Sequence, residues 1–202
     1  MITHIPQILM VICIIIYVSI YLVGIKKGNV KPVLATWLFF VLATILSFVT
    51  DFRQSGIHGL LADAFNIVDT FATFIIFLVI IFNKNTNKSF NKFEKGCLVA
   101  VFAVFILWLV SGQNILAHLA IQAILVIAYL PTLIHLWRAT ENTESLSMWS
   151  FDSAASALGT IEPLRTMTFL PLVYGIRSVI STLAVIVLII RLKYKHGNPR
   201  RQ

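Results

Sequence analysis

Carboxyl and amide side chains interrupt several stretches of the sequence that are otherwise apolar. Within residues 60–82, four polar side chains follow a spacing of three and four residues, which places them on one face of a helix: Asp63, Asn66, Thr70 and Thr73. A charged side chain at membrane depth costs about 2.5–3.5 kcal/mol, so such residues should face a bundle interior or a water-filled path. Three acids are therefore candidates for proton coupling or for polar binding: Asp63, Asp69 and Asp152.

Uncharged polar residues in the same stretches predict a path for a polar solute. Five of them are candidates for this path: Asn66, Thr70, Gln122, Ser156 and Ser178. The alternative is that hydroxyl side chains such as Thr70 and Ser156 only hold membrane helices together. For His118 and His135 we expect packing or interfacial positions, because no second histidine or carboxylate follows at a metal-ligand spacing. We expect no cofactor, and no Ser–His or metal constellation indicates an enzyme.

Two predicted outer loops each carry an acid and an arginine, namely Asp51 with Arg53 and Glu162 with Arg165. An external gate held by ion pairs would have this composition, and so would two ordinary solvated loops. Pro131 removes a hydrogen bond in the middle of a predicted helix and favours a kink, which serves either as a gating hinge or only as structure. The gating hypothesis therefore rests on Pro131, Arg53 and Arg165.

The elements that position these residues must lie in a membrane. Hydrophobic residues make up 58% of the 202 residues, against about 45–50% in soluble domains, and charged residues make up 12%, against about 25%. At about 20 apolar residues per crossing, most of the chain must lie in lipid. We predict an all-α polytopic membrane protein with seven spans, at 5–25, 33–50, 60–82, 97–110, 115–137, 148–161 and 168–190.

The basic residues alternate between the predicted loops. All but three of the 16 lysines and arginines fall on one side, and the exceptions are Arg53, Arg165 and Arg177. By the positive-inside rule the N-terminus is outside and the C-terminus is cytoplasmic. The net charge of +8 therefore reflects membrane orientation, and we expect no nucleic-acid partner.

A weak internal repeat divides the chain. Five residues recur in the same or a similar type 112 positions later, in the pairs Tyr17/Tyr129, Lys26/Arg138, Trp37/Trp149, Phe39/Phe151 and Arg53/Arg165. This offset predicts two parallel three-helix repeats, with residues 1–83 as the first bundle, 84–112 as loop and linker helix, and 113–202 as the second bundle and basic tail. We interpret Trp37 and Trp149, at the starts of their helices, as members of interfacial aromatic belts.

The run Tyr129-Leu-Pro131-Thr132, followed by Arg138 and by Glu144-Ser-Leu-Ser-Met-Trp149, resembles the PQ-loop motif of the SWEET-type superfamily. Thr132 stands where that motif has glutamine. More specifically, Thr36-Trp37 with the later Trp108, Tyr129-Leu-Pro131, Glu144-Ser-Leu and Arg191 resembles a set of small bacterial seven-span proteins. The resemblance implies seven spans in a 3-1-3 arrangement, in a cell inner membrane.

The same resemblance implies a central solute site between two bundles. Asn66 matches the asparagine on the third span of SWEET proteins, and Ser178 stands in the register of the asparagine on the seventh. The implied function is a transporter or facilitator of a small polar solute that works by alternating access. The alternative is a receptor or assembly factor of the same fold that binds a peptide or lipid cargo without translocation. The expected partners are the lipid bilayer and the small polar solute, and a homo-oligomer is a further alternative.

Overall fold

The computed structural model describes residues 5–62, 64–84, 86, 89–111 and 114–196, and these residues form seven α-helices. The helices are α1 (Ile5–Lys26), α2 (Leu34–Ala62), α3 (Ala64–Phe82), α4 (Lys92–Ser111), α5 (Asn114–Arg138), α6 (Leu146–Thr166) and α7 (Phe169–His196). Helices satisfy every backbone hydrogen bond within one segment, which is why apolar sequences adopt them in lipid. The described part of the chain is therefore all-helical, as the composition predicts.

Four helical segments are, among the described residues, both long enough and apolar enough to cross a membrane: Ile5–Lys26, Phe65–Phe82, Leu119–Arg138 and Pro171–Lys195. A shorter apolar segment, Leu34–Ser47, lies in α2. Large apolar side chains also cover the outer surface, such as Phe71, Val99 and Ile180, which are 64%, 69% and 63% exposed. Apolar side chains on this outer surface match a lipid environment, so the helices indicate a membrane-spanning protein.

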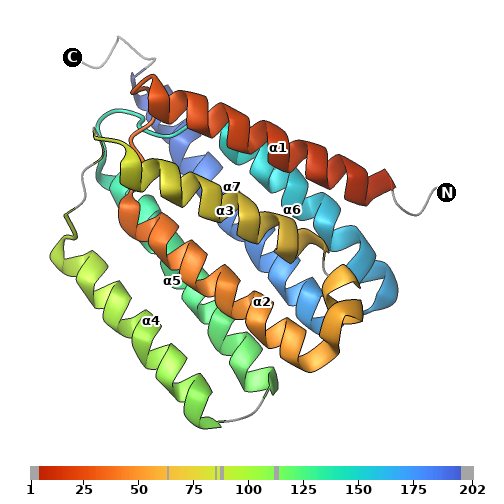
Figure 1. Cartoon of the computed structure of the whole chain (residues 1–202). Helices are drawn as coiled ribbons and strands as arrows, with labels where there is room; N and C mark the ends of the chain where they lie inside the picture. The colour runs from red at the N-terminus through yellow and green to blue at the C-terminus, as the bar shows by residue number, and fades with distance from the viewer. Residues whose placement is uncertain (1–4, 63, 85, 87–88, 112–113, 197–202) are drawn as a thin grey trace.

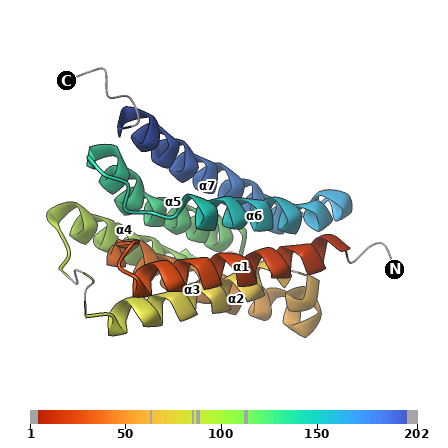
Figure 2. The same cartoon turned by 90° about the horizontal axis from the view of Figure 1, so that it is seen from above.

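The third helix of each half holds its two neighbours together. Helix α3 packs against both α1 and α2, and α7 packs in the same way against both α5 and α6. The two groups meet where α1 packs on α6 and α2 packs on α5, while α4 lies at the outside of the bundle against α5 (Figures 1 and 2). A space between the two groups is therefore surrounded by helices of both.

Three connections lie at the same end of the bundle as the C-terminal end of α7: residues 27–33, the described residues 83–84, 86 and 89–91, and residues 139–145 (Figure 1). We call this end the basic end, because it carries Lys26, Lys27, Lys31, Lys92, Arg138, Arg191, Lys193 and Lys195. The chain turns out of α1 at Gly28, whose φ of +74° is a left-handed conformation that suits glycine.

Local hydrogen bonds fix where two other helices begin. Ser145 caps α6 by accepting from the backbone N–H of Met148. Asn91 and Glu94 form a reciprocal capping box at the start of α4, with distances of 2.9 and 2.8 Å.

Several predicted boundaries were wrong. Helix α2 continues to Ala62, so Asp51 and Arg53 lie on a helix and not in a loop. Glu162 and Arg165 likewise lie in the last turns of α6. Helix α4 begins at Lys92, earlier than predicted, because a lysine and a glutamate in its first turn still support a helix. Arg177, which the count of basic residues assigned to the outer side, lies inside α7, within the predicted span 168–190.

Candidate functional site

Polar side chains from five helices, α1, α3, α5, α6 and α7, meet at the centre of the bundle. We call this group the central cluster: Tyr17, Asp69, Tyr129, Asp152, Tyr174, Arg177 and Ser178. Together with Trp37, Phe40 and Thr44 of α2, Thr73 of α3 and Leu125 of α5, they line a cavity of about 20 Å³. A space of this size holds about one water molecule. The bundle is thus closed around a polar centre.

Asp69 of α3 accepts a hydrogen bond on each carboxyl oxygen. The Tyr17 hydroxyl of α1 donates to Oδ1 at 3.1 Å, and the Tyr174 hydroxyl of α7 donates to Oδ2 at 2.9 Å. These residues are 52 and 105 positions from Asp69 in the sequence. One carboxyl group therefore connects the first three helices to the last three.

Arg177 supplies the positive charge of the central cluster. Its guanidinium carbon lies 4.8 Å from the centre of the Tyr174 ring, and its Nε donates to Oε1 of Gln122 at 2.9 Å. Asp152 of α6 is 8% exposed and lines the same cavity. With two carboxyl groups and one guanidinium, the cluster keeps one negative charge uncompensated if both acids are ionised. A proton, a cation or a solute rich in hydrogen-bond donors would balance this charge.

The structure brings part of the predicted set together. The acids Asp69 and Asp152 and the path residue Ser178 line the central cavity. Gln122 and Ser156 do not line it, but Gln122 accepts from Arg177 and Ser156 pairs with Ser178, and both of these partners do. The Ser156 hydroxyl lies 2.8 Å from that of Ser178.

Asn66 and Thr70 do not line the central cavity. Asn66 donates to the Ser47 hydroxyl at 2.8 Å and so joins α3 to α2. Thr70 donates to the carbonyl of Asn66, one turn earlier in the same helix. Pro131 is buried in α5, which continues through it, and Arg165 is exposed at the end opposite the basic end. Asp63 and the side chains of Arg53 and His118 lie outside the described residues.

Four residues of the central cluster were not predicted as site residues: Tyr17, Tyr129, Tyr174 and Arg177. The internal repeat could have indicated Tyr17 and Tyr129, because they occupy equivalent positions in it, and both line the cavity. The position of Arg177 in an apolar stretch, three residues after Tyr174, could have indicated it too, because an arginine there is costly unless it faces the bundle interior.

A layer of aromatic side chains around Glu144 closes the central cavity toward the basic end. We call Tyr21, Trp37, Glu144 and Trp149 the Glu144 layer. The Tyr21 hydroxyl and the Trp149 Nε1 both donate to Oε2 of Glu144, at 3.0 and 3.1 Å, and the Trp37 Nε1 donates to the Tyr21 hydroxyl at 3.2 Å. Trp37 and Trp149 are 2% and 1% exposed, so their assignment to interfacial belts was wrong. Their indole N–H groups find partners inside the bundle instead.

Glu144 lies in the connection between α5 and α6 and is 4% exposed. Burial disfavours its charged form and raises its pKa to about 7, although the hydrogen bonds from Trp149 and Tyr21 act in the opposite direction. The Glu144 layer therefore contains a carboxyl group that changes charge near neutral pH.

Comparisons of the chain with protein-family models, with curated proteins and with solved structures gave no match.

Proposed function

We propose that this chain is an integral membrane transporter or facilitator of a small polar solute. In this proposal the chain crosses the inner membrane of a bacterial cell seven times, in the 3-1-3 arrangement of the SWEET-type superfamily. Its N-terminus is outside and its C-terminus is in the cytoplasm. Helices α1–α3 and α5–α7 are the two moving bundles, and α4 is the linker. The repeated packing of α3 and of α7 between their neighbours supports this division.

The observation that carries the proposal is the shared carboxyl group of Asp69. Its two hydrogen bonds come from Tyr17 of one bundle and Tyr174 of the other, beside a water-sized cavity. A site built by both bundles changes shape when they rock against each other, which is the geometry that alternating access requires. We assign the observed conformation to the occluded state.

Opening toward the basic end would separate the Glu144 layer. Tyr21 and Trp37 belong to α1 and α2, whereas Glu144 and Trp149 belong to the second half, so the Tyr21–Glu144 hydrogen bond crosses the interface between the bundles. The Trp37–Tyr21 and Trp149–Glu144 bonds hold each side of the layer together. Thr36 and Thr132, whose hydroxyls lie 2.8 Å apart, join α2 and α5 next to Pro131. In this proposal Pro131 permits the bending of α5, and Asp152 with Asp69 accepts the solute or a coupled proton.

A thermal-shift screen of the purified protein tests the proposal. The probes are sugars, vitamins, nucleosides, amino acids and short peptides, because a ligand that binds only the folded state raises the unfolding temperature. We expect one class of small polar solute to stabilise the protein, and uptake of that solute into proteoliposomes should follow.

Asp152→Asn should abolish both the stabilisation and the uptake, and Glu162→Gln, at the end of α6, is the matched control that should preserve them. Full uptake by Asp152→Asn would remove Asp152 from the mechanism. Stabilisation by peptides alone, without uptake, would replace the transporter by the receptor.

A further inference from the structure

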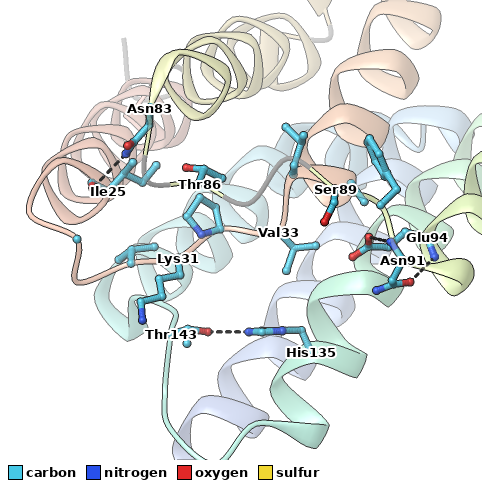
Figure 3. A pocket seen from close by; sticks show the side chains of 16 residues that line it. Ile25, Lys31, Val33, Asn83, Thr86, Ser89, Asn91, Glu94, His135 and Thr143 are labelled. Carbon is cyan, nitrogen blue, oxygen red and sulfur yellow. Dashed lines mark hydrogen bonds between the residues drawn. The ribbon is translucent and has the colours of Figure 1, made fainter.

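A second and larger cavity lies at the basic end. Its volume is about 450 Å³, within the usual range of small-molecule sites. The connections between α1 and α2 and between α3 and α4 form most of its wall, and His135 of α5 and Thr143 complete it (Figure 3). We call it the end cavity. The lining residues of the end cavity and of the central cavity are entirely different.

Hydrogen bonds between the connections hold the walls of the end cavity in place. The backbone N–H of Lys31 donates to the carbonyl of Thr143 at 3.0 Å, which joins the α1–α2 connection to the α5–α6 connection. Asn83 Nδ2 donates to the carbonyl of Ile25 at 3.4 Å, and the Asn91–Glu94 capping box fixes the start of α4. The cavity is therefore largely formed before a ligand arrives, which lowers the free-energy cost of binding.

The polar groups of the end cavity favour a negative charge on one side. Figure 3 shows Lys31, Thr143 and His135 along its lower edge, and Nε2 of His135 lies 3.2 Å from the Thr143 hydroxyl. An ammonium, an imidazole and a hydroxyl together suit a carboxylate or a phosphate. The acid in the wall, Glu94, already accepts the backbone N–H of Asn91 and serves as a helix cap.

Besides the polar side chains of Asn83, Thr86, Ser89 and Asn91, the lining has a large apolar part. It consists of Ile25, Val30, Pro32, Val33, Leu34, Ala35 and Phe90. A ligand that fills the cavity thus needs an apolar body as well as an anionic group.

We propose that the end cavity is a binding site for a small organic anion, with its carboxylate or phosphate at Lys31 and His135 and its apolar body against Phe90 and Val33. The site lies on the far side of the Glu144 layer from the central cluster, and binding there does not depend on transport. We commit to a soluble ligand and not to a lipid headgroup, because the walls are interhelical connections at the end of the bundle.

Isothermal titration with matched probes tests this site. Phenyl phosphate carries both the anionic group and a ring, benzyl alcohol carries the ring without the charge, and inorganic phosphate carries the charge alone. We expect phenyl phosphate to bind more tightly than either. Lys31→Gln should weaken its binding about 10- to 100-fold, since a hydrogen bond to a charged group is lost. Lys27→Gln, an exposed lysine of the same connection that does not line the cavity, should leave the affinity unchanged.

Four outcomes would overturn the proposal. The first three are no binding of phenyl phosphate, equally tight binding of benzyl alcohol, and equal weakening of phenyl phosphate binding by Lys27→Gln. The fourth is competition by phosphatidylglycerol but not by phosphatidylcholine in nanodiscs, which would assign the cavity to a lipid headgroup. Asp152→Asn should retain the affinity for phenyl phosphate. The transport proposal can therefore fail while this one stands, and the reverse also holds.

Discussion

The Tyr21 hydroxyl donates to Oε2 of Glu144 at 3.0 Å, across 123 residues of sequence. This hydrogen bond joins the first helix to the connection before α6 at a position where Glu144 is almost wholly buried. In the described part of the chain, the hydrogen-bond donors recorded for this carboxyl group come from Tyr21 and Trp149. A buried carboxylate without a cationic partner is destabilising, so the closed layer should be sensitive to protonation.

The first prediction is that the protein becomes more stable as the pH falls from about 8 to about 5. The pKa of Glu144 is about 7 in the folded state, against an ordinary value of 4.5. The folded state therefore binds a proton that the unfolded state releases between these values, and stability is lost as the pH rises through 7. Below pH 4.5 both states are protonated and this contribution no longer changes. Over the pH range from about 8 to about 5, the titration of Glu144 changes the free energy of unfolding by about 3 kcal/mol.

Thermal unfolding in detergent between pH 5 and 8 measures this effect. Glu144→Gln should flatten the dependence, because the amide is neutral throughout and keeps an acceptor oxygen. Glu141→Gln changes an exposed acid of the same connection and should retain the slope. An identical slope in wild type and Glu144→Gln would show that another group is responsible.

A second prediction concerns the hydroxyl pair of Ser156 and Ser178, which lie 2.8 Å apart between α6 and α7. Replacing either one by alanine should lower the free energy of unfolding by about 0.5–1 kcal/mol, since hydrogen bonds between membrane helices contribute about that much. The double variant should lose less than the sum of the two single losses, because each one already breaks the shared bond. Strict additivity in a double-mutant cycle would contradict the pairing.

A third prediction uses the close approach of α6 to α3. A Cβ on Gly159 would lie 2.7 Å from Cγ and 3.0 Å from Cβ of Phe65, which is buried. Gly159→Ala should therefore destabilise the protein by about 1–3 kcal/mol through overpacking. At Gly96 a Cβ would meet no atom within 4 Å, so Gly96→Ala should be neutral or stabilising by up to about 1 kcal/mol. Equal unfolding temperatures for the two variants would show that Gly159 is not tightly packed.

Sequence reasoning predicted the helices well because long apolar runs have few alternatives in a membrane. It placed the ends poorly where polar residues continue a helix, as at Asp51 and Arg53 in α2. A hydropathy window ends a span at such residues, although the backbone has no reason to leave the helix there. Arg177 was counted with the outer basic residues although the predicted span 168–190 contains it, and its partner Gln122, 55 residues away, cannot be read from the sequence.

The candidate site was predicted in part, through its acids. Asp69 and Asp152 stand out because a carboxyl group in an apolar run is costly, and both line the central cavity. Tyr17 and Tyr174 did not stand out, since tyrosine is equally suited to a membrane interface and to a buried site. Trp37 was misplaced because its partner, Tyr21, lies on another helix, and periodicity along one helix cannot show a partner on another.

The last prediction tests the orientation and the number of spans together. Lys27 and Thr166 are both exposed, at the basic end and at the opposite end, and five helices from α2 to α6 separate them. In a background with Cys13 and Cys97 replaced by serine, Thr166→Cys should react with a membrane-impermeant maleimide on intact cells. Lys27→Cys should react only after permeabilisation, because basic residues remain in the cytoplasm. The reverse pattern would invert the orientation, and labelling of both from one side would mean that an even number of spans lies between them.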